Sequence, residues 1–496
     1  MELIFEKSVP GRKGMVFPEE DVSTRAEIPE RFRRDEPPEL PELSELDVVR
    51  HFTALSRRNF GVDTNFYPLG SCTMKYNPKC CEEVARYEGF SGLHPLLPQL
   101  RLGGSLTQGA LQVIYETERL LSEIVGMAEV TMQPLAGAHG ELTGAMIIAA
   151  YHRAKGNRKT KVIVPDSGHG TNPASAAIAG YQVVSVPTND RGIMDPEALG
   201  AVLDEEVAAL MLTSPNTLGL FNPHIPEIAR MIHEVDGLMY CDGANLNATL
   251  GKCRPGDIGF DIVHLNLHKT FAAPHGGGGP GAGPVGVVQR LAEFLPISLV
   301  IKRNDGTYAL QYDRPSSVGY IAPFYGNFEV ILKTYAYIRL LGREGLIQAS
   351  EHAVLNANYV MEKLKPYYHF PYERCMHECI LSAVKQLEHG VRALDIAKGL
   401  LDRGFHPPTI YFPLIVKEAM MIEPTETESK ETLDAFIEAM IELANIAESD
   451  PEALRRAPTR TPVSRLDEVA AARDMDLGSL SNPEKEPGPA QAVRKK

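Results

Sequence analysis

The sequence predicts an α/β protein with a mostly parallel central sheet flanked by helices and a smaller α/β domain on the C-terminal side. Short, continuous runs rich in Val, Ile and Leu recur along the chain, and segments with helical or turn character separate them. Such runs are typical of buried parallel strands, and their alternation with helices indicates an α/β core. Six runs are expected to be strands: 161–164, 182–186, 208–212, 238–241, 262–267 and 285–288.

The first helices of this core are predicted from apolar spacing and from end signals. Residues 108–128 place Leu111, Ile114 and Leu121 on one helical face. A second helix is expected from 138 to 156, where a glycine can end it. A third begins at Asn172-Pro173 and ends at Gly180.

The distribution of Pro, charge and helical pattern divides the chain into four parts. Residues 1–80 are expected to form an N-terminal arm and a loop segment, because they are rich in Pro, Gly and charge. Residues 81–330 form the large domain. The strongly helical stretch 328–365 leads into a small C-terminal domain, 331–477, with helices near 391–403 and 430–447. The tail 478–496 has a disordered composition.

Composition excludes several classes of function. The net charge of the 496 residues is 50 − 64 = −14, which gives no support to nucleic-acid binding. No run approaches the length of a membrane span, and the charged first residues do not resemble a signal peptide. Seven scattered cysteines indicate reduced thiols in the cytoplasm, and the paired spacing of a zinc knuckle is missing, so no metal is predicted.

Two glycine-rich segments stand where ligands bind in an open α/β sheet, beside the carboxyl ends of strands. The segment 133–141 (QPLAGAHGE) opens a helix with small residues, so that backbone N–H groups can approach an anion; a tight packed turn is the alternative. The segment 166–173 (DSGHGTNP) follows a strand. Its His169 lies between glycines, which leaves room for the ring to lie flat on a ligand, although a lone histidine is more often a hydrogen-bonding residue.

Two further segments carry a carboxylate and a lysine. Asp242 ends an apolar strand, where an unpaired carboxylate is costly to bury. Asp242 therefore either has a cationic partner or caps a helix. Lys269 follows the apolar run 262–267, and a lysine in a crowded site can become an imine-forming nucleophile. In this order the four segments match pyridoxal phosphate, which needs phosphate donors, a stacking face, an acid for the ring nitrogen and a Schiff-base lysine.

The chain resembles the glycine dehydrogenase (decarboxylating) family, the P-proteins of the glycine cleavage system, and in particular the second subunit of its two-subunit form. The resemblance covers nearly the whole chain except about the last twenty residues. The motifs that carry it are LIFEKSVPGRKG, GVDTNFYPLGSCTMKYNPK, QPLAGAHGE, DSGHGTNPAS, CDGANLNA, LNLHKTFAAPHGGGGPG and TPVSRLDEVAAAR. It implies a fold-type-I pyridoxal-phosphate enzyme with a large and a small domain.

The resemblance also implies roles for single residues. Lys269 would hold the cofactor covalently, Asp242 would pair with the pyridinium, and Ala244 would pack on the ring. His169 would stack on the ring and take part in catalysis. The remaining implied cofactor contacts are Gly137 and Ala138 for the phosphate, and Thr171, Asn216 and His268 around the ring. His139 replaces the glutamine often found in single-chain relatives, so no ring contact is assigned to it.

The activity that the resemblance implies is decarboxylation of glycine through a pyridoxal-phosphate aldimine, with transfer of the aminomethyl group to the lipoyl arm of the H-protein. The implied partners are glycine dehydrogenase subunit 1, in an α2β2 assembly, and functionally the T-protein and L-protein. Two alternatives stay open from the residues alone. The same four segments would serve an aminotransferase or a desulfurase, and a non-catalytic stabilising subunit is the third hypothesis.

Overall fold

The computed structural model describes residues 2–19, 21, 28–36, 38–99, 104–277 and 281–475, and these fall into two compact units, 1–64 and 65–496. The first unit holds one long helix, α1 (Glu45–Ser56), which Ser44 and Asp47 cap reciprocally. Arg12 forms an ion pair with Asp47 at 2.9 Å, which ties the preceding segment to the start of this helix. Two short 3₁₀ turns complete this unit: η1 (Phe5–Lys7) and η2 (Glu30–Phe32).

The second unit is built on a seven-stranded sheet in the order β1-β7-β6-β5-β4-β2-β3. The strands from β3 to β6 run parallel, whereas β7 runs antiparallel to both of its neighbours. The strands are β1 (Glu129–Thr131), β2 (Lys161–Pro165), β3 (Gln182–Val186), β4 (Val207–Thr213), β5 (Leu238–Asp242), β6 (Ile262–His264) and β7 (Val285–Val287). This arrangement agrees with the predicted parallel core.

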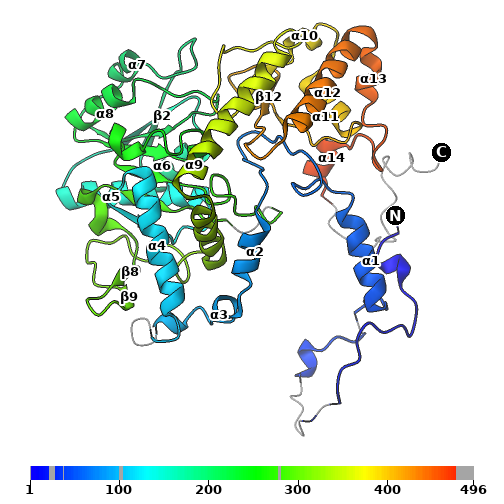
Figure 1. Cartoon of the computed structure of the whole chain (residues 1–496), viewed down its shortest axis with the longest axis horizontal. Helices are drawn as coiled ribbons and strands as arrows, with labels where there is room; N and C mark the ends of the chain where they lie inside the picture. Colours follow the sequence, from blue (N-terminus) through cyan, green and yellow to red (C-terminus); the bar gives the residue numbers. More distant parts are fainter. Residues whose placement is uncertain are drawn as a thin grey trace. The chain divides into compact units, whose positions relative to one another are not determined.

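Helices and short turns flank this sheet and follow the predicted alternation (Figure 1). Apolar faces explain their positions: α4 buries Leu111, Ile114 and Leu121 in the core, as its spacing predicts. The elements are α2 (Lys79–Ala85), α3 (Glu88–Ser91), α4 (Gln108–Val125), α5 (Gly137–Lys155), α6 (Thr171–Ile178), α7 (Pro196–Gly200), α8 (Ile225–Glu234), η4 (Leu246–Ala248), η5 (Pro255–Ile258) and η6 (Gln289–Phe294). A separate two-stranded sheet pairs β8 (Leu299–Lys302) with β9 (Tyr308–Gln311).

The helix α9 (Phe328–Leu364) contributes to two hydrophobic cores, one spanning residues 81–346 and one built mostly from 357–454. The predicted single helix is interrupted at Gly342, whose φ of 60° and ψ of −171° are not helical. The second core surrounds a small antiparallel sheet, β10-β12-β11, and helices that pack together beside it (Figure 1). These elements are β10 (Cys379–Ser382), α10 (Val384–Leu387), α11 (Ala393–Leu401), β11 (Thr409–Ile410), β12 (Ala419–Ile422), α12 (Lys430–Ser449) and α13 (Pro451–Arg456). The last helix, α14 (Glu468–Arg473), follows them in the chain and buries none of its residues.

The segment before Lys269 differs from the prediction, because β6 ends at His264 and not at Leu267. The chain beyond His264 still donates from Leu265 N to Pro284 O (2.9 Å) and from Leu267 N to Ala282 O (3.1 Å). Proline has no N–H with which to return the bond, so the ladder stops there. The tail predicted after 477 lies outside the described residues.

Candidate active site

A cavity of about 220 Å³ lies where the parallel strands end at their carboxyl side. Thr213 ends β4 and Asp242 ends β5, and the sheet register sets Asp242 beside both Thr213 and His264. Of the nine predicted site residues, all but Asn216 line the cavity. The lining residues are Ser71, Gly137, Ala138, Glu141, His169, Thr171, Thr213, Thr217, Asp242, Ala244, Asn245, Asn266, His268 and Lys269.

Asp242 is buried, and neutral donors surround its carboxylate. It accepts hydrogen bonds from Asn172 Nδ2 (2.9 Å), Thr213 Oγ1 (3.2 Å) and the backbone N–H of Ala244 (3.1 Å). Burial opposes ionisation, but His264, with Nε2 at 3.4 Å, and these donors hold the pKa of Asp242 below its ordinary value. Burial in turn lowers the pKa of His264, so this carboxylate can accept a further cation.

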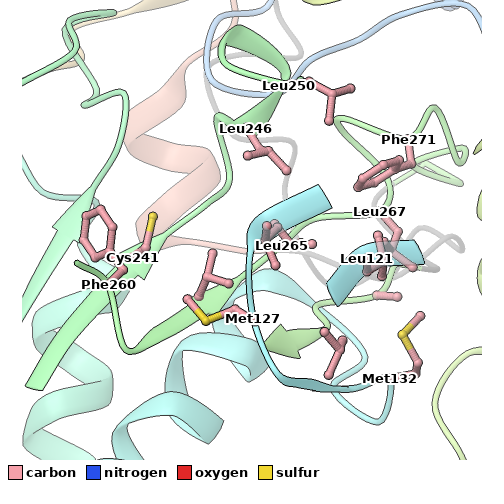
Figure 2. Packing of buried hydrophobic residues seen from close by; sticks show 14 of the residues in the cluster. Leu121, Met127, Met132, Cys241, Leu246, Leu250, Phe260, Leu265, Leu267 and Phe271 are labelled. Carbon is pink, nitrogen blue, oxygen red and sulfur yellow. The ribbon is translucent and has the colours of Figure 1, made fainter. Parts of the chain in front are cut away.

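Lys269 lies in the turn after β6, and apolar neighbours fix that turn. Leu265, Leu267 and Phe271 are buried and point into the packed interior (Figure 2). Within the described part of the chain, no acidic side chain forms an ion pair with its Nζ. Buried Lys75 donates to the carbonyl of Thr270 (2.8 Å), which holds the turn from the other side. The amine of Lys269 is thus positioned without being neutralised by a carboxylate.

The start of α5 presents backbone donors to the cavity. Gly137 and Ala138 are its first residues, and Ala136 at the N-cap gives no side-chain cap. Gly137 also packs closely on Asn266, because a Cβ there would lie 2.8 Å from the Asn266 amide. An uncapped helix N-terminus at a cavity wall binds anions through its N–H groups and its dipole.

Three further predicted residues stand around the same cavity. His169 is exposed, and its Nδ1 lies 2.7 Å from Thr171 Oγ1. His268 accepts weakly from the backbone N–H of Ala282 (3.4 Å) and meets His275 edge to face at 5.2 Å. Burial first, and then the charges of His275 and Lys269, lower the pKa of His268 to about 3, so its ring is neutral.

Asn216 is the predicted residue that the structure does not bring to this cavity. Its Nδ2 donates to Gly192 O (2.6 Å), and its Oδ1 accepts from the backbone N–H groups of Leu218 and Leu220 (3.0 Å each). The side chain therefore organises its own loop, and the cavity lining instead includes Asn245.

Six lining residues were not predicted as site residues, and two of them, Glu141 and Ser71, carried a usable signal in the sequence. Glu141 lies one helical turn after Gly137, so the spacing alone places both on one face. It is buried, its Oε2 has no hydrogen-bond partner, and burial together with Asp242 raises its pKa to about 8. Ser71 lies in the Gly- and Pro-rich loop 60–80, whose composition is typical of functional loops or irregular packing.

These residues fit pyridoxal phosphate on the chemistry of their donors. The open N–H groups of α5 suit the phosphate, and the buried carboxylate of Asp242, without a Lys or Arg partner among the described residues, suits a protonated ring nitrogen. Lys269 supplies the amine for a Schiff base. Both ends of the cofactor and its covalent anchor thus find matching groups on one cavity wall.

Comparisons with known proteins agree with this geometry. Residues 349–458 match the family model "Glycine dehydrogenase, C-terminal domain", and residues 138–279 match "Aminotransferase class-V". The chain is 59% identical, over 95% of its length, to proteins named "Probable glycine dehydrogenase (decarboxylating) subunit 2" from Halalkalibacterium halodurans and Bacillus licheniformis, and it covers 96% and 97% of them.

Among solved structures, the fold is similar to an inhibitor-bound glycine decarboxylase (P-protein) of the glycine cleavage system, with a TM-score of 0.67 and 22% identity. That match covers 86% of this chain and 93% of the other. The cysteine desulfurase CsdA of Escherichia coli shares the fold at a TM-score of 0.60 and 15% identity, over 79% and 98% of the two chains. In the parts that the structure describes, no helix has the length and apolar character that a membrane span requires.

Proposed function

Because this chain belongs to the family of glycine dehydrogenase (decarboxylating) subunit 2, we propose that it binds pyridoxal phosphate and decarboxylates glycine in the glycine cleavage system. The observation that carries this proposal is a single cavity wall with three features. It holds a lysine without an ion-pair partner, a buried aspartate and an uncapped helix start. The redox change falls on the lipoyl disulfide, so this subunit needs no nicotinamide.

Each residue has a defined task in this proposal. Lys269 would hold the cofactor covalently, and the amino group of glycine would take its place. Asp242 keeps the ring nitrogen protonated, and the first N–H groups of α5, at Gly137 and Ala138, hold the phosphate. His169 stacks on the ring. Thr171 orients His169 through their 2.7 Å contact, while Ala244 and neutral His268 flank the ring.

When bound, pyridoxal phosphate supplies an electron sink for the electron pair that remains after the bond to the carboxylate breaks. The chain contributes a setting that favours this loss. No arginine is found among the described residues that line the cavity, so this part of the chain offers no guanidinium to the glycine carboxylate. A carboxylate held without such a partner in a partly desolvated site gains more by leaving as neutral CO2. This favours decarboxylation over transamination, where the carboxylate must stay.

The proposal includes the partners that the family relationship implies. The aminomethyl group passes to the lipoyl arm of the H-protein, and this chain assembles with subunit 1, in an α2β2 form, in the cytoplasm. The T-protein and L-protein complete the cycle. The family name "subunit 2" supports a partner subunit directly.

Borohydride reduction of the cofactor-loaded protein, followed by peptide mapping, tests the covalent site. We expect the label on Lys269, and a label on another lysine would contradict the assignment. Exchange of labelled bicarbonate into glycine, measured with subunit 1 and lipoylated H-protein, tests the reaction. Lys269→Ala should abolish this exchange. Wild-type protein without exchange would favour an aminotransferase or desulfurase, whereas unchanged activity of Lys269→Ala would indicate a stabilising subunit.

A further inference from the structure

An apolar loop stands at the mouth of the candidate active site, and the proposed function gives it no task so far. It joins β11 to β12 and comprises residues 411–416 (YFPLIV), here called the apolar loop. Leu414 is 88% exposed, Ile415 44% and Tyr411 41%, so three large side chains of one short loop face solvent. Neighbouring exposed apolar side chains of this kind mark interaction sites.

Two contacts place the apolar loop beside the cavity. The ring of Phe412 meets the ring of His169 edge to face, with the ring centroids 6.4 Å apart. His169 lines the cavity and is also exposed, so it marks a point where the cavity opens to solvent. The strand before the loop, β11, is tied to the cavity wall, because Thr409 Oγ1 donates to the carbonyl of Gly70 (2.8 Å), next to the lining residue Ser71. A molecule that enters beside His169 therefore passes the apolar loop.

The apolar loop is held in one shape by its own residues. Phe412 and Val416 pack on a small hydrophobic cluster from β10 and β12, and Pro413 is buried. The backbone N–H of Val416 donates to the carbonyl of Pro413 (3.1 Å), which closes a turn at Leu414 and Ile415. The packed and the exposed side chains thus have separate tasks, and the exposed ones are presented on a fixed support.

The two ends of the apolar loop adopt a costly backbone conformation. Tyr411 and the nearby Glu418 have φ values of 58° and 50°, in the left-handed region that side chains other than glycine disfavour. Hydrogen bonds hold them there. The N–H of Tyr411 donates to the carbonyl of Ala419 (2.9 Å), and the carboxylate of Glu418 accepts from the N–H of Ala393 (2.8 Å). Enforced strain of this kind is typical of binding sites.

The apolar loop and the residues before it are uncharged. Residues 407–416 (PPTIYFPLIV) contain no Asp, Glu, Lys, Arg or His. A surface that recognises a phosphate group or a charged peptide uses charged side chains, and these residues supply none. Their chemistry suits a ligand with an apolar, uncharged body.

The proposed function brings such a ligand to this place. The lipoyl arm is a chain of methylene groups that ends in a dithiolane ring, and its amide bond to lysine leaves it without charge. To reach Lys269 the arm has to pass from the surface through the mouth of the cavity. A permanently docked subunit on the same loop would narrow that opening, whereas an arm that binds and leaves keeps it accessible.

We infer that the apolar loop is the docking surface for the lipoyl arm of the H-protein. Leu414 and Ile415 receive its methylene chain, and Phe412 borders the point beside His169 where the arm enters. The inference rests on the proposed function and assigns the surface that guides the second substrate. None of the described residues 411–416 lines the cavity, so the loop contributes binding and takes no part in the chemistry.

The double variant Leu414→Ser with Ile415→Ser removes the exposed apolar surface and leaves the packed side chains in place. Calorimetric titration of the cofactor-loaded complex with subunit 1, without glycine, gives its affinity for lipoylated and for unlipoylated H-protein. We expect lipoylation to tighten binding to the wild type about 10-fold, through partial burial of the methylene chain. The variant should lose most of this advantage, while its affinity for the unlipoylated carrier stays within about twofold of the wild type.

Steady-state kinetics give an independent measure. The variant should raise KM for lipoylated H-protein about 10-fold and leave kcat within about threefold, because uniform binding is lost and the chemistry is not. The glycine-induced change in the cofactor spectrum should remain. The matched control is Leu340→Ser with Leu355→Ser, two leucines of α9 that are 55% and 63% exposed, and it should keep the wild-type KM.

Four results would overturn the inference. They are a wild type that does not distinguish the two forms of H-protein, equal weakening of both forms in the variant, a KM no higher than that of the control, and loss of subunit 1 from the variant in sedimentation velocity. The second would assign the loop to the body of the carrier, and the last would assign it to a subunit interface. Wild-type protein that forms no aminomethylated H-protein would instead refute the proposed function.

Discussion

Glu141 should make the stability of the cofactor-free protein depend on pH in a measurable way. Its carboxyl group is buried beside Asp242, and these two effects raise its pKa to about 8 from the ordinary 4.5. Between these values the folded state binds a proton that the unfolded chain releases. The contribution of Glu141 to stability is therefore complete at low pH and declines as pH rises from about 4.5 to 8.

The size of this effect follows from the shift. A difference of 8 − 4.5 = 3.5 units corresponds to about 5 kcal/mol across the whole window, at about 1.4 kcal/mol per unit. Because Glu141 and Asp242 titrate together, this figure is an upper bound for Glu141 alone. Glu141→Gln cannot ionise, so its stability relative to the wild type should rise steadily with pH.

Scanning calorimetry of both cofactor-free proteins from pH 5 to 8 is the assay. We expect the unfolding temperature of Glu141→Gln, relative to that of the wild type, to rise as pH increases. Glu293→Gln, at an exposed position of η6, is the control and should keep a constant difference. Parallel curves for Glu141→Gln and the wild type would refute the reasoning, because they would mean that Glu141 is ionised in the folded protein.

Two further predictions concern the support of the cavity. Lys75→Met takes away the cation that lies 2.7 Å from the largely buried carboxylate of Glu426 and leaves it only the hydroxyl of Tyr337, at 3.5 Å, among the hydrogen bonds of the described residues. We expect a loss of about 3–5 kcal/mol, seen as a lower unfolding temperature. Replacing Glu426 by Leu as well should restore much of it, and no recovery would contradict an ion-pair origin. Gly283→Ala would put a Cβ 2.0 Å from the carbonyl oxygen of Ala136 and displace the start of α5. Overpacking of this kind costs about 1–3 kcal/mol. Because the start of α5 holds the phosphate in the proposed function, pyridoxal phosphate should bind roughly 5- to 150-fold more weakly to this variant in an absorbance titration. Gly89→Ala, a position with open space around it, should bind the cofactor normally.

The parallel core could be predicted from the sequence because each strand has a recognisable pattern in its own residues. Runs such as 238–241 are short, apolar and flanked by helix signals, and such a pattern needs no knowledge of distant contacts. The predicted end of β6, at residue 267, was wrong because of a contact that the local pattern does not contain. Leu265 and Leu267 are as apolar as a strand requires, but the residue opposite Leu265 is Pro284, which has no N–H to complete the ladder.

The candidate site could be predicted where its residues end a strand, follow one closely or begin a helix. Asp242 ends β5, Lys269 lies in the turn after β6 and Gly137 begins α5, and the topology of a parallel sheet gathers them at one edge. The buried group of His377, Glu378 and Glu423 could not be foreseen, because His377 and Glu423 are 46 residues apart and approach each other through the pairing of β10 with β12. The hydrogen bonds by which Asn216 stabilises its own loop could not be predicted from the local sequence either.

The bonds of the Ser71 loop also bear on how the protein is made. Ser71, Thr73 and Lys75 leave the ribosome early, yet their partners Glu378, Glu423 and Glu426 follow 307 to 351 residues later. At a translation speed of about 5–20 residues per second, this gap lasts roughly 15–70 s. During that time the nascent chain exposes a Gly- and Pro-rich segment whose docking surface has not been synthesised. The cavity wall is thus completed late in synthesis, and cofactor loading should follow chain release.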